Sequence, residues 1–325
     1  MSSQTFKISN QISIQEIENI YEKNLQKILF EFFNLESEWF YNAYDEYKDL
    51  DKYLILVYLM QRTLETYNKH FYKVDFEKFY SSPHIEIEKI SISEIVKKLL
   101  ISKETARRKL NQLSVAGILV RKRKNIRINK INFNPRLKKN VYNLSKLSYL
   151  FCKNLSRNNN LAFITRAEIE EKILLNYTQY WNIFFKFQIE YLLRCKKLFS
   201  SIDAFYIWGL CALNEAMNSK KLNELKKEIF YQQEENFFER VIKLKDSKGL
   251  NPTTISELSG IPRATVIRKI NFLVKKKFLH KDKQLYKINN NLKSKIFFKL
   301  QGSFFAENQK QLRNLLKDIL NLLQN

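Results

Sequence analysis

The apolar positions between residues 266 and 288 repeat first with a helical period and then in short runs typical of strands. Val266, Ile270 and Leu273 fall at i, i+4 and i+7, which predicts a helix with one apolar stripe. After this helix, two short apolar runs flank a basic tip, and they predict a two-stranded hairpin. The stripe residues are expected to be core, so we give them no functional role.

A shorter helix is predicted just upstream of the stripe. Thr254 and Glu257 have the spacing of a capping box, in which each side chain bonds the main-chain N–H of the other residue. Gly260 adopts a left-handed backbone without steric cost and is expected to end this helix. Pro262 suits the first turn of the next helix, where its missing N–H does no harm. The segment is therefore predicted to be helix, tight turn, helix and hairpin.

The same pattern occurs between Ser91 and Asn129. Ser91 and Glu94 form a second predicted capping box, and Ser102 is the expected N-cap of the next helix. This copy is expected to carry three extra residues between its capping box and its turn. A shift of 160 positions superimposes identical residues of the two copies: Thr105 on Thr265, Arg108 on Arg268, Lys109 on Lys269, Asn111 on Asn271, Leu113 on Leu273 and Leu119 on Leu279.

The repetition extends upstream with a shift of 152 positions. It places Glu16-Ile17-Glu18 on Glu168-Ile169-Glu170, Asn24 on Asn176, Phe32-Phe33 on Phe184-Phe185 and Asp51 on Asp203. No gap is needed across this span. Because the matches share one register and end in the same motif, we predict an internal duplication with two copies of about 155 residues each.

The capping box, the turn, the threonine early in the second helix and the basic hairpin together resemble the winged helix-turn-helix of bacterial transcription regulators. The order of elements is similar to that of the MarR type. The resemblance implies that the second helix of each module enters the DNA major groove while the wing contacts phosphates. Together with the predicted duplication, it implies that one chain binds as a monomeric pseudo-dimer.

Composition supports a mainly α fold. The 325 residues include 45% hydrophobic residues but five Gly and four Pro, which leaves few turns for hairpins. We therefore expect a mainly α protein with two winged helix-turn-helix modules with small β-wings, each attached to a helical bundle. One continuous helix is predicted from about Gln15 to Tyr47.

The expected domains follow from these boundaries. They are a flexible tail (1–11), the helical region of copy one (12–85), winged helix one (86–132), a helix and linker (133–163) with its seam at Asn154–Asn160, the helical region of copy two (164–248) with an insertion at about 219–248, winged helix two (249–290) and a C-terminal helical region (291–325). The last helix carries an apolar stripe that is expected to pack on other helices, with dimer formation through it as an alternative.

The formal net charge is +24, because 57 Lys and Arg outnumber 33 Asp and Glu. Such an excess favours polyanionic partners. Charge alone leaves nucleic acid, an acidic membrane surface and an acidic protein open. The basic residues cluster in the two predicted wings, which favours double-stranded DNA. The candidate phosphate contacts are Arg121, Lys122, Arg123, Lys124, Arg127, Lys275, Lys276, Lys277, Lys281, Lys283 and Lys287.

The candidate base contacts lie at the front of the two second helices, because the amino-terminal residues of a recognition helix reach base edges. They are Lys103, Glu104, Thr105, Arg107, Arg108 and Asn111 in copy one, and Arg263, Thr265, Ile267, Arg268 and Asn271 in copy two. The copies differ at Glu104/Ala264 and Arg107/Ile267. We therefore expect an imperfect inverted repeat with half-site centres about 10 base pairs apart.

Other chemistry has little support in the sequence. Cys152, Cys195 and Cys211 have neither disulfide nor zinc spacing, and no cofactor, metal site or enzyme motif is found. No signal-peptide run is present, so a cytoplasmic, nucleoid-associated protein is expected. A transcription regulator is the leading interpretation. A plasmid-replication initiator, a non-specific nucleoid-type DNA binder and an unknown small-molecule effector stay open.

Overall fold

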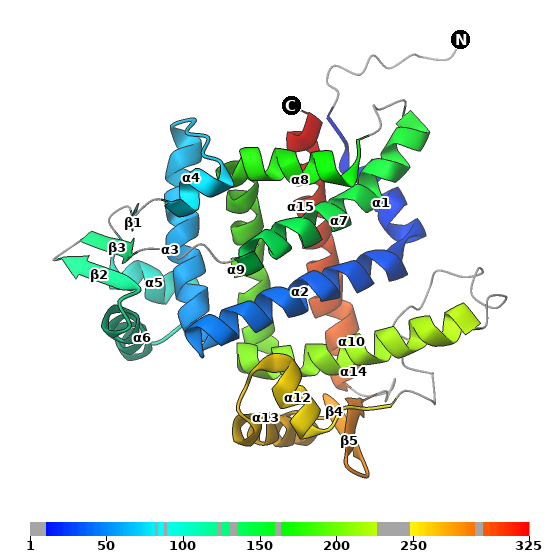
Figure 1. Ribbon diagram of the computed structural model, residues 1–325. Helices are drawn as coiled ribbons and strands as arrows, with labels where there is room; N and C mark the ends of the chain where they lie inside the picture. Colours follow the sequence, from blue (N-terminus) through cyan, green and yellow to red (C-terminus); the bar gives the residue numbers. More distant parts are fainter. Residues whose placement is uncertain are drawn as a thin grey trace.

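The computed structural model describes residues 11–81, 84–87, 90–122, 125–129, 135–159, 164–225, 248–289 and 295–324. The chain is mainly helical, with small antiparallel sheets at its periphery (Figure 1). This confirms the mainly α fold class. Residues 1–10 of the predicted tail, most of the predicted insertion, and the basic residues Arg123 and Lys124 lie outside the described residues.

The first half of the chain begins with three helices, α1 (Ile14–Lys23), α2 (Leu25–Tyr47) and α3 (Leu50–Lys69), and a short α4 (Phe76–Ser81). The elements β1 (His84–Ile87), α5 (Ile92–Leu99), α6 (Lys103–Val115), β2 (Leu119–Lys122) and β3 (Asn125–Asn129) follow, and α7 (Pro135–Asn159) ends this half.

The second half repeats most of this order. It contains α8 (Arg166–Leu175), α9 (Tyr177–Phe199), α10 (Ile202–Leu225), α12 (Pro252–Ser259), α13 (Arg263–Lys275), β4 (Leu279–Asp282) and β5 (Leu285–Ile288). The helix that starts at residue 295 comprises α14 (Lys295–Lys299), the π-helical η2 (Leu300–Phe305) and α15 (Ala306–Gln324). The first residues of α1, α2 and α3 precede those of α8, α9 and α10 by 152 positions. The first residues of α5, α6 and α7 precede those of α12, α13 and α14 by 160 positions.

The two halves pack reciprocally in the core. Helix α3 packs against α9, and α10 packs against α2; likewise α7 packs against α8, and α15 packs against α1. Aromatic side chains fill the centre, where Phe32 meets Tyr191 edge to face with ring centroids 5.7 Å apart and Phe40 stacks on Tyr206 at 4.8 Å. The core is therefore shared by both halves rather than divided between them.

The sheets are small and peripheral. In the first half, β1 and β2 both pair antiparallel with β3, so that Ile85 lies opposite Ile128. In the second half, β4 pairs with β5. The place of a third strand is taken by Leu250, which forms a single β-bridge with Tyr286. Gly249 is required beside this bridge because an added Cβ would lie 2.7 Å from the Tyr286 carbonyl oxygen.

Two boundaries differ from the sequence prediction. The predicted helix from Gln15 to Tyr47 is broken at Asn24, whose side-chain amide donates to the Ile20 carbonyl at 2.9 Å and ends α1. The predicted linker at Asn154–Asn160 was wrong, since α7 continues to Asn159. Leu155 explains this continuation, because it is 2% exposed and its burial outweighs the weak helix propensity of its polar neighbours.

The stripe of the C-terminal helix lies inside the chain. Leu312, Leu315, Leu316, Ile319 and Leu323 are buried, and α15 packs on α9, α1 and α7. The stripe is therefore not available to a second copy. Within the described residues, none of the helices combines the length and apolar character needed to cross a membrane.

Candidate nucleic-acid interface

Helices α5 and α6 form a helix–turn–helix, and a serine side chain caps the amino-terminal end of each helix. Ser91 and Glu94 make the predicted capping box at the start of α5. Ser102 accepts the Thr105 main-chain N–H at 3.1 Å and starts α6 as predicted. Leu100 occupies the turn with a positive φ of 52°, at the position where the second half has Gly260 with a φ of 72°.

Helices α12 and α13 make the equivalent turn, but the predicted capping box at Thr254 was wrong. Asn251 is the N-cap, its side chain accepts the Thr254 main-chain N–H at 2.9 Å, and Pro252 occupies the first turn. As a result, α12 and α5 are both eight residues long. The three extra residues predicted in the first copy therefore do not exist.

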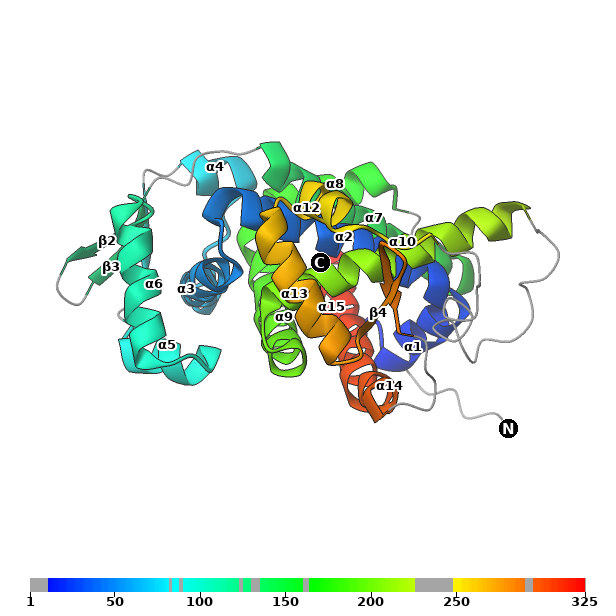
Figure 2. The same cartoon turned by 90° about the horizontal axis from the view of Figure 1, so that it is seen from below.

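The inner face of each second helix is buried against its own module. Ala106, Leu110 and Leu113 of α6 are buried, as are Val266, Ile270 and Leu273 of α13. The opposite faces are turned outward, and in the view from below both α6 and α13 lie uncovered by other ribbons (Figure 2). Both second helices are thus accessible from this side of the molecule.

Most predicted base-facing side chains lie on those outer faces. The exposed ones are Lys103, Glu104, Arg107, Arg108 and Asn111 on α6, and Arg263, Arg268 and Asn271 on α13. Thr105, Thr265 and Ile267 are half-buried. The Thr105 hydroxyl accepts from the Ser102 hydroxyl at 2.9 Å, so this side chain also supports the start of its own helix.

The hairpins carry basic side chains at their surface. Lys275, Lys276, Lys277, Lys281 and Lys283 are exposed around β4 and β5. Lys287 is half-buried and pairs with Asp282 at 3.2 Å, and Arg127 pairs with Glu86 at 2.6 Å. Exposed pairs such as Arg127–Glu86 are weak, so this pair does not prevent a contact of Arg127 with phosphate. Arg121 and Lys122 lie on β2, but their side chains are not among those that the structure describes.

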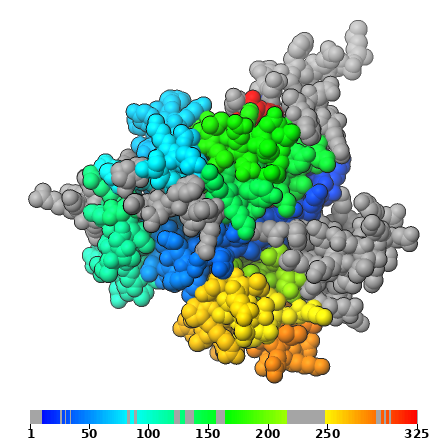
Figure 3. All heavy atoms as spheres, viewed as in Figure 1, coloured from blue at the N-terminus to red at the C-terminus, as the bar shows by residue number. Residues whose placement is uncertain are grey.

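An asparagine at the end of each hairpin fastens it to the turn that follows the preceding helix. Asn129 donates its main-chain N–H to the Ile118 carbonyl at 2.8 Å and its side-chain amide to the Gly117 carbonyl at 3.2 Å. Asn289 donates in the same way to the Phe278 carbonyl at 3.1 Å and the Lys277 carbonyl at 2.9 Å. The two hairpins therefore leave their helices through the same local geometry. Both modules form peripheral parts of the molecular surface (Figure 3).

Sequence reasoning missed the polar groups that attach these modules to the core. Lys109, matched with Lys269 in the repeat, is only 7% exposed and pairs with Asp49. Glu215 of α10 is buried and accepts the Ile288 main-chain N–H of β5 at 2.8 Å. The position of Lys109 beside the apolar stripe of α6 was the available signal, because a residue next to that stripe faces partly inward.

Residues 86–131 match the family of DeoR-like helix-turn-helix domains. The match covers the end of β1 together with α5, α6, β2 and β3, which are the elements of the first module. It identifies this segment as a helix-turn-helix domain of a DNA-binding type. Neither a curated protein nor a solved structure matches the chain.

Proposed function

We propose that the chain is a sequence-specific transcription regulator that binds double-stranded DNA through two winged helix-turn-helix modules. The observation that carries the proposal is the second module. Helices α12 and α13 repeat the bounds of α5 and α6 with a shift of 160 residues, and α13 exposes Arg263, Arg268 and Asn271 as α6 exposes Arg107, Arg108 and Asn111. A single chain then carries two recognition helices.

An internal duplication would account for this arrangement. It is supported by equal element lengths, because α1 and α8 each have ten residues and α2 and α9 each have 23. Equivalent capping boxes at Ser13 and Thr165 begin α1 and α8. The reciprocal packing of α3 on α9 and of α10 on α2 has the form of a twofold dimer interface. The chain would therefore act as a monomeric pseudo-dimer.

The exposed residues suit a division between base reading and phosphate binding. The guanidinium groups of Arg108 and Arg268 can bind the O6 and N7 atoms of guanine with two hydrogen bonds. The exposed lysines Lys276, Lys281 and Lys283 would contact phosphates, which fixes the orientation without reading the sequence. Because α6 and α13 differ at Arg107/Ile267, the two half-sites would be similar but unequal.

Selection of bound duplexes from a random DNA pool, followed by footprinting, tests the proposal. We expect one imperfect inverted repeat whose half-site centres are about 10 base pairs apart. Enrichment of no sequence at moderate salt would contradict specific reading and favour a charge-driven nucleoid binder. Protection of an array of repeats at a replication origin would favour an initiator instead.

Matched variants locate the reading residues. Arg108→Ala and Arg268→Ala should each relax selection at a different half-site. Lys186→Ala is the control, because Lys186 is an exposed basic residue on α9 rather than on a recognition helix. Equal effects of all three substitutions on every sequence would exclude base reading by the two arginines.

A further inference from the structure

Lys109 and Lys269 occupy equivalent positions on α6 and α13, directly after the arginines proposed to read bases. Neither side chain is exposed, since Lys109 is buried and Lys269 is half-buried. They lie on the side of each recognition helix that faces the helical core. A contact with DNA is therefore not their role.

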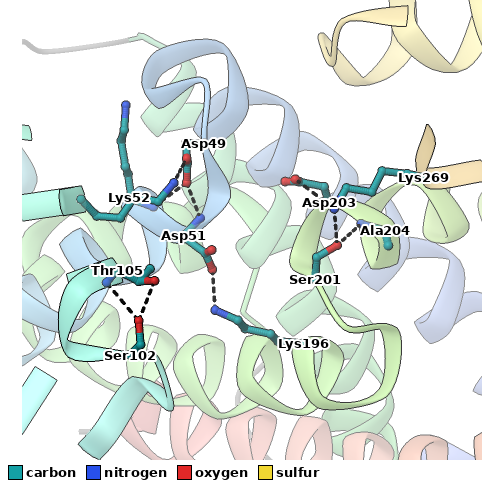
Figure 4. A network of polar contacts seen from close by, with 11 residues as sticks. Asp49, Asp51, Lys52, Ser102, Thr105, Lys196, Ser201, Asp203, Ala204 and Lys269 are labelled. Atoms are coloured by element: carbon teal, nitrogen blue, oxygen red, sulfur yellow. Dashed lines mark hydrogen bonds and ion pairs between the residues drawn. The ribbon is translucent and has the colours of Figure 1, made fainter. Parts of the chain in front are cut away.

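Each lysine binds the start of a core helix. Lys109 pairs with the carboxylate of Asp49, which caps α3 by accepting the main-chain N–H groups of Asp51 at 3.0 Å and Lys52 at 3.1 Å. Lys269 donates to the Ser201 hydroxyl at 2.9 Å, and the same hydroxyl oxygen accepts the Ala204 main-chain N–H at 3.2 Å (Figure 4).

The two contacts are equivalent in position but differ in chemistry. Asp49 and Ser201 are 152 positions apart, as α3 and α10 are. The first contact is an ion pair with a buried lysine, whereas the second is a hydrogen bond to a neutral hydroxyl, with the Asp203 carboxylate 3.9 Å from Lys269. A hydrogen bond between two charged groups is stronger than one to a neutral group.

A further ion pair ties the core helices of the two halves together. Lys196 of α9 pairs with Asp51 of α3 at 2.7 Å, next to the Asp49 cap (Figure 4). Helix α9 ends at Phe199, immediately before Ser201 and α10. Three lysines and three aspartates therefore form one balanced group, referred to here as the cap cluster: Lys109, Lys196, Lys269, Asp49, Asp51 and Asp203. It lies between the attachment points of the two recognition helices.

We propose that Lys109 and Lys269 are positioning residues that set the placement of α6 relative to α13. The inference rests on the proposed function, because its consequence is a preferred spacing between two half-sites. If both helices are held rigidly, the protein should bind well only to DNA with a narrow range of spacings between the two half-sites. A weaker contact at either lysine lets the matching half-site vary more, and a stronger contact lets it vary less.

Exchange of the two capping residues tests this. Asp49→Ser gives the first half the neutral cap of the second, and Ser201→Asp gives the second half the charged cap of the first. Both substitutions keep a good N-cap residue, so the core helices retain their starts. Asp75→Ser is the matched control, because Asp75 accepts the Lys78 main-chain N–H at 2.8 Å at the start of α4, outside the cap cluster.

The first measurement needs no DNA. Spin labels at Val115→Cys on α6 and Lys275→Cys on α13 report the distance between two exposed, equivalent positions. Cys152 is replaced by serine, because Cys195 and Cys211 are buried and Cys152 is only partly so. We expect Asp49→Ser to broaden the distance distribution, Ser201→Asp to narrow it and Asp75→Ser to leave it unchanged. Equal widths in all four proteins would overturn the inference.

The second measurement uses the selected operator with its spacer lengthened or shortened by one base pair. For the Asp49→Ser variant, we compare the affinity for the operator with the preferred spacing with the affinity for the operator with the altered spacing. The ratio of these two affinities should fall about tenfold, which is the effect of losing one hydrogen bond to a charged group. Ser201→Asp should raise this ratio, and Asp75→Ser should not change it. Unchanged ratios in both exchange variants would contradict the inference. If the wild-type chain selects no sequence, the proposed function fails, while the label distances still decide the placement of the helices.

Discussion

Glu36 should make the stability of the fold depend on pH near neutrality. Its side chain lies on α2 inside the shared core and is 4% exposed. Burial disfavours the charged carboxylate and raises its pKa from 4.5 to about 8, although a hydrogen bond with Tyr191 acts in the opposite direction. Its Oε1 atom has no hydrogen-bond partner among the described residues. The equivalent position of the second half is Gln188, whose amide donates to the Tyr53 hydroxyl at 2.7 Å.

The sign follows from the two pKa values. The folded chain keeps the Glu36 proton up to about pH 8, whereas the unfolded chain releases it near the ordinary value of 4.5. The contribution to stability is therefore fully present below pH 4.5 and is lost as pH rises through 8. Because one pH unit within this window corresponds to about 1.4 kcal/mol, raising the pH from about 5.5 to about 7.5 should lower the free energy of unfolding by about 2 to 3 kcal/mol.

Glu36→Gln should remove this loss, since glutamine does not titrate and is the residue of the equivalent position. Urea unfolding of the wild type and the variant at both pH values measures the difference. Glu215 is a matched comparison, because burial raises the pKa of its carboxyl to about 7. Glu215→Gln should therefore remove a smaller part of the pH dependence of stability, and the part due to Glu36 should remain. Full retention of the wild-type pH dependence in Glu36→Gln would show that this carboxyl is not buried in the way described.

Three further predictions concern the two modules. Arg268→Ala should weaken binding to the selected operator by about 1–3 kcal/mol and relax selectivity at one half-site, which titration against operator variants measures. Lys281→Ala should weaken binding to all sequences and reduce the slope of affinity against salt by about one unit; an unchanged slope removes Lys281 from the phosphate contacts. Leu100 is 70% exposed in a left-handed turn, so Leu100→Gly should stabilise the fold by about 1 kcal/mol, whereas Gly260→Ala should destabilise it by a similar amount in thermal unfolding.

The local signals of the sequence predicted the first module well. Ser91 and Ser102 cap the two helices as expected, because a cap depends on residues within three positions of each other. The same reasoning failed at Thr254, where Asn251 and Pro252 provide an earlier helix start that the capping-box motif concealed. A competing local motif, rather than a long-range effect, caused this error.

The buried polar contacts could not be predicted in the same way. Lys109 is separated from Asp49 by 60 positions, and Lys196 is separated from Asp51 by 145. No local pattern connects such residues, since their proximity arises only when α6 packs on α3 and α9 packs beside it. The exposed arginines, in contrast, were predicted from helical periodicity alone. Once the apolar positions assign the buried face of an amphipathic helix, the residues opposite them are assigned to the exposed face.

The reciprocal packing of the two halves has a consequence for how the molecule persists in a cell. Helix α7 packs on the start of the second half, and α15 packs on the start of the first, so each half completes the interior of the other. An ordinary dimer dissociates on dilution and can exchange subunits with a related protein. Two halves of one chain cannot separate or exchange in this way. The two modules would therefore stay paired even at a few molecules per cell.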